Sequence, residues 1–133
     1  MPDRWKVLLV DDEEDFATAL AERLRLRGIV VDTAFDGETA LQKLVAYNPQ
    51  VVVLDVMMPG IGGLAVLQHI KAQKPETQVI LLTGKGSTRD GIEGMRLGAY
   101  DYLVKPVQID ELIGKLKEAA GAVEAATSPM TKE

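Results

Sequence analysis

The feature that most constrains the fold of this chain is a run of apolar residues (51–54) that ends in Asp55. A run of β-branched residues without alternating polar positions is typical of a strand that is buried on both faces, as in parallel sheets covered by helices. Open sheets of this kind place their functional groups at the carboxyl ends of the strands. Pro59 and Gly60 then indicate a loop. We therefore expect Asp55 at the chemically active edge of a parallel sheet.

Strand and helix signals alternate along the rest of the chain. Four further strands are expected over residues 6–10, 29–35, 78–83 and 100–104. The segments between and after the strands carry apolar residues at helical spacing. These are Phe16, Leu20 and Leu24; Leu41, Leu44 and Val45; Leu64, Leu67 and Ile70; and Leu112, Ile113, Leu116 and Val123. The pattern predicts a doubly wound α/β fold with five parallel strands in a single domain.

Local signals mark the ends of these helices. Gly28 is expected to end the first helix, Asp36 to cap the second, and Asn48-Pro49 to end it. The fourth helix is expected to begin near Ser87. It contains glycines at positions 91 and 94, each of which lowers helix stability by about 1 kcal/mol relative to alanine. Two interpretations stay open for this helix: loose packing at the surface, or a segment adapted to shift.

Composition narrows the classes of function. The chain has 133 residues, of which 47% are hydrophobic and 26% charged, which is ordinary for one soluble globular domain. It contains no cysteine, which excludes disulfides, thiolate metal sites and cysteine nucleophiles. No segment resembles a signal peptide or a membrane span, so we expect a cytoplasmic protein without membrane contacts. The net charge of −5 argues against direct binding to nucleic acid.

Four of the expected strands end in chemically useful side chains. Asp11 and Asp12 follow the first strand, Asp55 ends the third, Thr83 ends the fourth, and Lys105 follows the fifth. The carboxyl ends of parallel strands share one edge, so these residues should converge. Clustered carboxylates repel one another, and oxygen ligands without histidine or cysteine favour a hard ion such as Mg²⁺. A carboxylate, a divalent ion, a lysine and a hydroxyl form a set suited to phosphoryl transfer. The acidic residues 13–15 are explained equally well as the solvated start of a helix.

With these residues in place, the chain resembles the receiver domains of bacterial two-component response regulators. The resemblance covers residues 4–123, and residues 124–133 are expected to be a short tail or the start of a linker. It depends on the acidic pair after the first strand, Asp55 within LDVMMPG, Leu82-Thr83-Gly84, and the segment YDYLVKP that ends at Pro106. It implies a flavodoxin-like (βα)5 fold with strand order 2-1-3-4-5.

The resemblance also implies roles for the converging residues. Asp55 would accept a phosphoryl group from a sensor histidine kinase or a histidine phosphotransfer protein. Asp12, Asp55 and the backbone carbonyl of Met57 would bind Mg²⁺, or alternatively Mn²⁺, and Asp11 would act indirectly. Lys105 would pair with the phosphoryl group, and the Lys105–Pro106 peptide bond would be cis.

Further positions match the switch and the access route of this family. Thr83 and Tyr102 would form the switch, in which a hydroxyl moving toward the phosphoryl group is coupled to rotation of an aromatic ring. Gly84, Met57 and Lys85 would control access to the phosphoryl group. Because neither Met57 nor Lys85 offers a carboxylate or amide to orient water, we expect self-dephosphorylation at an ordinary to slow rate.

The resemblance predicts a signalling domain that catalyses only its own phosphorylation and dephosphorylation. Its fourth helix, fifth strand and fifth helix would control a downstream protein or output domain, with the chain a monomer or a phosphorylation-dependent dimer. One alternative is the receiver portion of a longer transcriptional regulator or hybrid kinase. A more remote one is a Mg²⁺-dependent aspartyl phosphatase, which usually needs a second acid where this chain has Met57.

Overall fold

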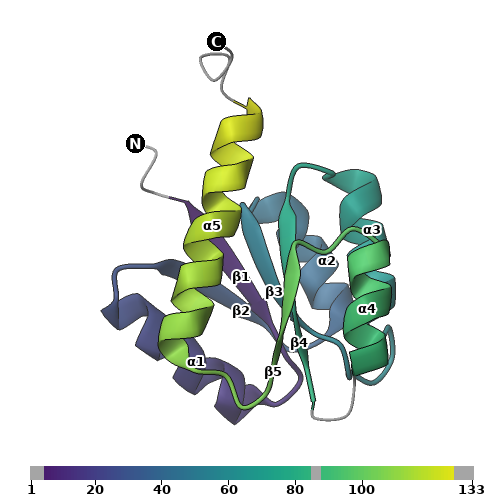
Figure 1. Ribbon diagram of the computed structural model, residues 1–133. Helices are drawn as coiled ribbons and strands as arrows, with labels where there is room; N and C mark the ends of the chain where they lie inside the picture. The colour runs from purple at the N-terminus through teal and green to yellow at the C-terminus, as the bar shows by residue number, and fades with distance from the viewer. Residues whose placement is uncertain (1–4, 85–87, 128–133) are drawn as a thin grey trace.

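The computed structural model describes residues 5–84 and 88–127, and its architecture confirms the expected fold. Five parallel strands lie in the order β2-β1-β3-β4-β5, with helices on both faces of the sheet (Figure 1). The strands are β1 (Lys6–Val10), β2 (Val30–Ala34), β3 (Val51–Asp55), β4 (Gln78–Thr83) and β5 (Asp101–Val104). The helices are α1 (Glu14–Leu26), α2 (Gly37–Ala46), α3 (Gly63–Gln73), α4 (Thr88–Arg96) and α5 (Ile109–Thr127).

The core consists of two apolar layers, one on each face of the sheet. Buried residues of α1 and α5 pack against one face, and those of α2 and α3 pack against the other. All five residues of β3 are buried, as expected for a strand covered on both sides. No helix in the described ranges is long and apolar enough to cross a membrane.

The ends of the first two helices follow from their sequences. Gly28 adopts a positive φ of 83° just after α1, a conformation that glycine reaches without strain. The side chain of Asp36 caps α2 by accepting a hydrogen bond of 2.7 Å from the backbone N–H of Thr39. Of the apolar residues expected in this helix, Leu44 is buried together with Ala40 and faces the sheet, whereas Val45 is exposed.

Of the two interpretations of the glycines in α4, loose packing at the surface is wrong. Gly91 and Gly94 are both buried. A Cβ atom on Gly91 would lie 2.7 Å from the ring of Tyr102, and one on Gly94 would overlap the side chain of Leu81. The glycines therefore allow α4 to approach β4 and β5 closely. The capping role expected for Ser87 lies outside the described residues.

Strand register brings the predicted site residues to one edge of the sheet. Val10 pairs with Leu54, which precedes Asp55, and Thr83 pairs with Val104. Chain segments distant in sequence therefore end side by side. At the C-terminal end of the described chain, α5 continues to Thr127, beyond residue 123.

Candidate functional site

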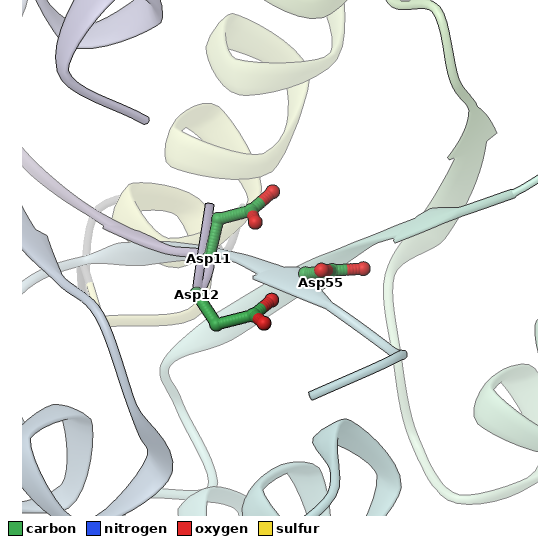
Figure 2. Close-up of side chains that lie close together, drawn as sticks. All are labelled: Asp11, Asp12 and Asp55. Carbon is green, nitrogen blue, oxygen red and sulfur yellow. The ribbon is translucent and has the colours of Figure 1, made fainter. Parts of the chain in front are cut away.

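Three carboxylates form the centre of the site (Figure 2). Asp11 and Asp12 come directly after β1, and Asp55 is the last residue of β3. One carboxylate oxygen of each lies within 4.8 Å of those of the other two. Asp11 is fully buried and Asp55 is 4% exposed, whereas Asp12 is more open to solvent. Two buried carboxylates so close together require a compensating positive charge.

Lys105 provides positive charge from the loop that follows β5. Its Nζ lies 2.9 Å from Oδ2 of Asp11 and 3.6 Å from Oδ2 of Asp55. The backbone N–H of Lys105 donates a 2.7 Å hydrogen bond to the carbonyl of Thr83, and the Lys105–Pro106 peptide bond is cis. The lysine therefore joins the ends of β1, β3 and β5.

The environment changes the ionisation of both partners. Burial raises the pKa of Asp55 to about 6, and the negative charge of Asp11 adds to this effect while Lys105 opposes it. Burial alone would lower the pKa of Lys105, but its hydrogen bond to Asp11 and the surrounding carboxylates raise it above the ordinary value. Lys105 is therefore a firmly protonated cation beside a carboxyl group that ionises reluctantly.

The donor chemistry of the cluster fits a hard divalent cation. Its side-chain ligands would all be carboxylate oxygens, which Mg²⁺ and Mn²⁺ prefer over nitrogen and sulfur ligands. The backbone N–H of Met57 donates a 3.2 Å hydrogen bond to Oδ1 of Asp55, which orients that carboxylate. Oδ2 of the same group faces Lys105.

A solvent-accessible cleft of about 310 Å³ leads to the carboxylates. It is lined by Asp12, Glu13, Asp55, Met57, Gly84 and Lys105. A Cβ atom on Gly84 would meet nothing within 4 Å, so this wall of the cleft is open. The access role expected for Lys85 falls outside the described residues. The cleft thus admits a small group to Asp55 from solvent.

The two residues expected to form the switch belong to neighbouring strands, Thr83 to β4 and Tyr102 to β5. Thr83 is completely buried and does not line the cleft, and its Oγ1 lies 3.5 Å from the carbonyl of Leu103, to which it donates a long hydrogen bond. Tyr102 is half-buried, with its ring against Gly91 of α4. The structure thus brings together the aspartates and Lys105, while the Thr83 hydroxyl points to the neighbouring strand.

Sequence reasoning missed two residues that contact Lys105. Oε1 of Glu13 lies 3.4 Å from its Nζ, and the ring centroid of Phe16 lies 4.7 Å from it. Glu13 belongs to an acidic run that is equally consistent with a helix start, and Phe16 fits the apolar spacing of α1. Their closeness to Lys105 depends on how α1 packs, so no local signal identifies it.

Comparison with known proteins agrees with this geometry. The curated relatives include the transcriptional regulatory protein DltR of Streptococcus agalactiae, 38% identical over 112 residues that cover 84% of this chain and 50% of that protein. The probable transcriptional regulatory protein TcrX of Mycobacterium tuberculosis is 40% identical over 111 residues, which cover 84% of this chain and 47% of that protein. The chain therefore spans about half the length of these relatives.

Solved structures and a family model point the same way. The receiver domain of the Francisella response regulator 1452 is 38% identical with a TM-score of 0.81, covering 87% of this chain and 96% of that one. A response regulator receiver domain protein from Clostridium thermocellum is 30% identical with a TM-score of 0.88, covering 92% and 99%. The family model described as "Response regulator receiver domain" matches residues 7–117. The chain therefore belongs to the family of response regulator receiver domains.

Proposed function

We propose that this receiver domain accepts a phosphoryl group on Asp55 from the phosphohistidine of a sensor histidine kinase or a histidine phosphotransfer protein. The observation that carries the proposal is the position of Asp55: it is buried, it faces a cleft open to solvent, and it lies 3.6 Å from the Lys105 ammonium. Thr83 ends β4 at the same edge of the sheet.

In the proposed reaction, a carboxylate oxygen of Asp55 attacks the phosphorus of the phosphohistidine. A P–O bond forms as the P–N bond breaks, and the electron pair of the broken bond stays on the imidazole of the donor. Lys105 would then move from Asp11 toward the phosphoryl group on Asp55 and offset its negative charge. The Met57 N–H holds the other carboxylate oxygen in place.

The aspartate cluster is the proposed binding site for Mg²⁺, with Mn²⁺ as the alternative. Asp12, Asp55 and the backbone carbonyl of Met57 would hold the ion directly, and Asp11 would act through water or through its neighbours. The bound ion would offset the repulsion between the carboxylates and neutralise charge on the phosphoryl oxygens. The all-oxygen donor set supports this assignment.

The proposed output passes through α4 and β5. Thr83 would leave the Leu103 carbonyl for the phosphoryl group, and Tyr102 would change its place against α4, whose glycine-rich sequence lowers the resistance to a shift. Ile92 and Met95 of α4 are exposed apolar residues, as is Val104 of β5. Such a surface suits a downstream protein, an output domain or a second copy of the chain.

The domain would be a switch without substrate turnover, catalysing only its own phosphorylation and dephosphorylation. Curated relatives about twice as long are transcriptional regulators, which supports the proposal that the chain acts as the receiver portion of such a regulator. Nucleic acid would then be contacted by the output domain rather than by this acidic domain.

Labelling with acetyl phosphate and Mg²⁺ tests the proposal. Mass spectrometry should detect one phosphoryl group per chain, located on Asp55, and none in Asp55→Asn. Asp15→Asn, which makes the same chemical change at an exposed residue of α1, should be labelled like the wild type. Labelling of Asp55→Asn would contradict the assignment, and steady hydrolysis of a phosphomonoester would favour an aspartyl phosphatase.

A further inference from the structure

Two groups at the start of α1 contact the Lys105 ammonium: the ring of Phe16 within the helix and the carboxylate of Glu13 just before it. The ring of Phe16 lies beneath it, with 4.7 Å between Nζ and the ring centroid, a distance at which an ammonium is attracted to an aromatic face. The carboxylate of Glu13 lies 3.4 Å from the same Nζ, at the rim of the cleft.

The two groups differ in how firmly they are held. Phe16 is half-buried and packs against the core layer shared by α1 and α5, so its ring position is fixed by the fold. The Glu13 side chain is 66% exposed, so solvent screens its attraction for the lysine. The uncharged ring of Phe16 leaves the positive charge of Lys105 available, whereas the carboxylate of Glu13 competes with any other anion for that charge.

We propose that Phe16 is a positioning residue for Lys105 in the phosphorylation of Asp55, and that Glu13 opposes this role by drawing the ammonium toward the rim of the cleft. The inference rests on the proposed function and extends it to Phe16 of α1 and to Glu13, the residue that precedes this helix. Phe16 keeps the ammonium near Asp55 while leaving its charge available to a phosphoryl group. Glu13 uses part of that charge and adds a further negative charge to the entrance.

Opposite signs are therefore expected for the two substitutions. With acetyl phosphate and saturating Mg²⁺, Phe16→Leu should lower the initial rate of Asp55 phosphorylation about three- to tenfold, because leucine retains the apolar packing but has no π face. Phe16→Tyr retains the face and should stay within about twofold of the wild type. Equal rates for Phe16→Leu and wild type, or equal losses for Phe16→Leu and Phe16→Tyr, would overturn the positioning role.

Phe35 provides the matched control for this substitution. It is the other phenylalanine of the chain and packs against the same core layer, and no cation lies over its ring within the described residues. Phe35→Leu should therefore leave the rate within about twofold of the wild type. A loss equal to that of Phe16→Leu would mean that core packing, and not the contact with Lys105, sets the rate.

Glu13→Gln should raise the rate of Asp55 phosphorylation, because it removes the carboxylate that competes for Lys105. The increase should be only about two- to fivefold, since an ion pair this exposed to solvent contributes little energy. Glu14→Gln removes the same charge one residue later, and no ion pair joins Glu14 to Lys105 within the described residues. It should leave the rate unchanged. A decrease in Glu13→Gln, or an equal increase in Glu14→Gln, would refute the competing role of Glu13.

A double-mutant cycle tests the Phe16–Lys105 contact independently of phosphorylation. Urea unfolding of the wild type, Phe16→Leu, Lys105→Met and the double variant, without metal or phosphodonor, should give unfolding constants coupled about threefold or more. Additive effects would overturn the contact whatever the labelling shows. Failure of the wild type to be labelled, with coupling present, would instead overturn the proposed function.

Discussion

Replacing Asp55 by asparagine should stabilise the metal-free domain. The carboxyl group has an unfolded-state pKa of 3.8, which burial and the charge of Asp11 raise to about 6 in the folded protein. The folded state therefore binds the Asp55 proton more tightly than the unfolded state does, and stability falls as the pH rises through this window. A difference of about two pH units, at about 1.4 kcal/mol per unit, means that the ionised carboxylate destabilises the fold by about 3 kcal/mol at neutral pH.

Asparagine removes this charge and preserves the shape of the side chain. Its carbonyl can still accept the hydrogen bond from the Met57 N–H. The attraction to Lys105 is lost, but the repulsion from Asp11 is lost with it. We therefore expect the free energy of unfolding to rise by about 1–3 kcal/mol near neutral pH.

Urea unfolding in the presence of EDTA measures this gain, with the fluorescence of Trp5, the single tryptophan, as the probe. The difference between Asp55→Asn and the wild type should shrink as the pH is lowered toward about 4, because the wild-type carboxyl group then becomes protonated. Asp15→Asn, on the exposed side of α1, should change stability by no more than about 0.5 kcal/mol. The reasoning is refuted if Asp55→Asn is destabilising at neutral pH or if its gain is independent of pH.

Three further predictions concern other parts of the fold. The hydroxyl of Tyr47 is buried without a hydrogen-bond partner in the described part of the chain, so Tyr47→Phe should raise the unfolding free energy by about 1 kcal/mol. Because burial raises the pKa of Tyr47 to about 12, the unfolded chain ionises this group first. The unfolding free energy should therefore be unaffected by this titration below pH 10 and should fall between about pH 10 and 12 in the wild type but not in Tyr47→Phe, and absorbance titration can follow the ionisation. Gly91→Ala should lower the midpoint of thermal unfolding, at a loss of about 1–3 kcal/mol, since its Cβ would meet the Tyr102 ring; Gly114→Ala, in open space on α5, should raise it. Asp36→Ala should lower the midpoint of thermal unfolding through loss of the α2 cap. Because the pKa of Asp36 is lowered by its hydrogen bonds to Thr39, this loss should be present above pH 4 and shrink on acidification, as denaturation curves at several pH values would reveal.

Much of the architecture could be predicted because local chemistry and the global fold agree. The β-branched run before Asp55 favours a strand buried on both faces, and such strands require helices on both sides of a parallel sheet. Parallel strands end at a common edge, so the convergence of Asp11, Asp55 and Lys105 follows from topology alone. Hydrophobic periodicity also indicated Leu20 and Leu24, two of the buried residues of α1.

Features that depend on contacts between elements required the folded structure. Spacing of 3.6 residues does not establish which side of α2 meets the sheet, and the structure shows that Leu44 is buried there while Val45 is exposed. In the sequence, the glycines of α4 indicated only a low helix propensity. In the structure, the ring of Tyr102 packs so closely against Gly91 that there is no room for a larger residue. Glu13 and Phe16 carry no local signal of their contact with Lys105. That lysine is 89 positions or more away in the sequence and reaches them only because the start of α1 lies near the loop that follows β5. The amino-acid sequence thus established the strands, their burial and the edge where the aspartates meet, since these follow from short-range pattern and topology. Only the tertiary structure decided which residues contact Lys105 and how closely α4 packs against β4 and β5. Both depend on side-chain packing between elements that are distant in the sequence.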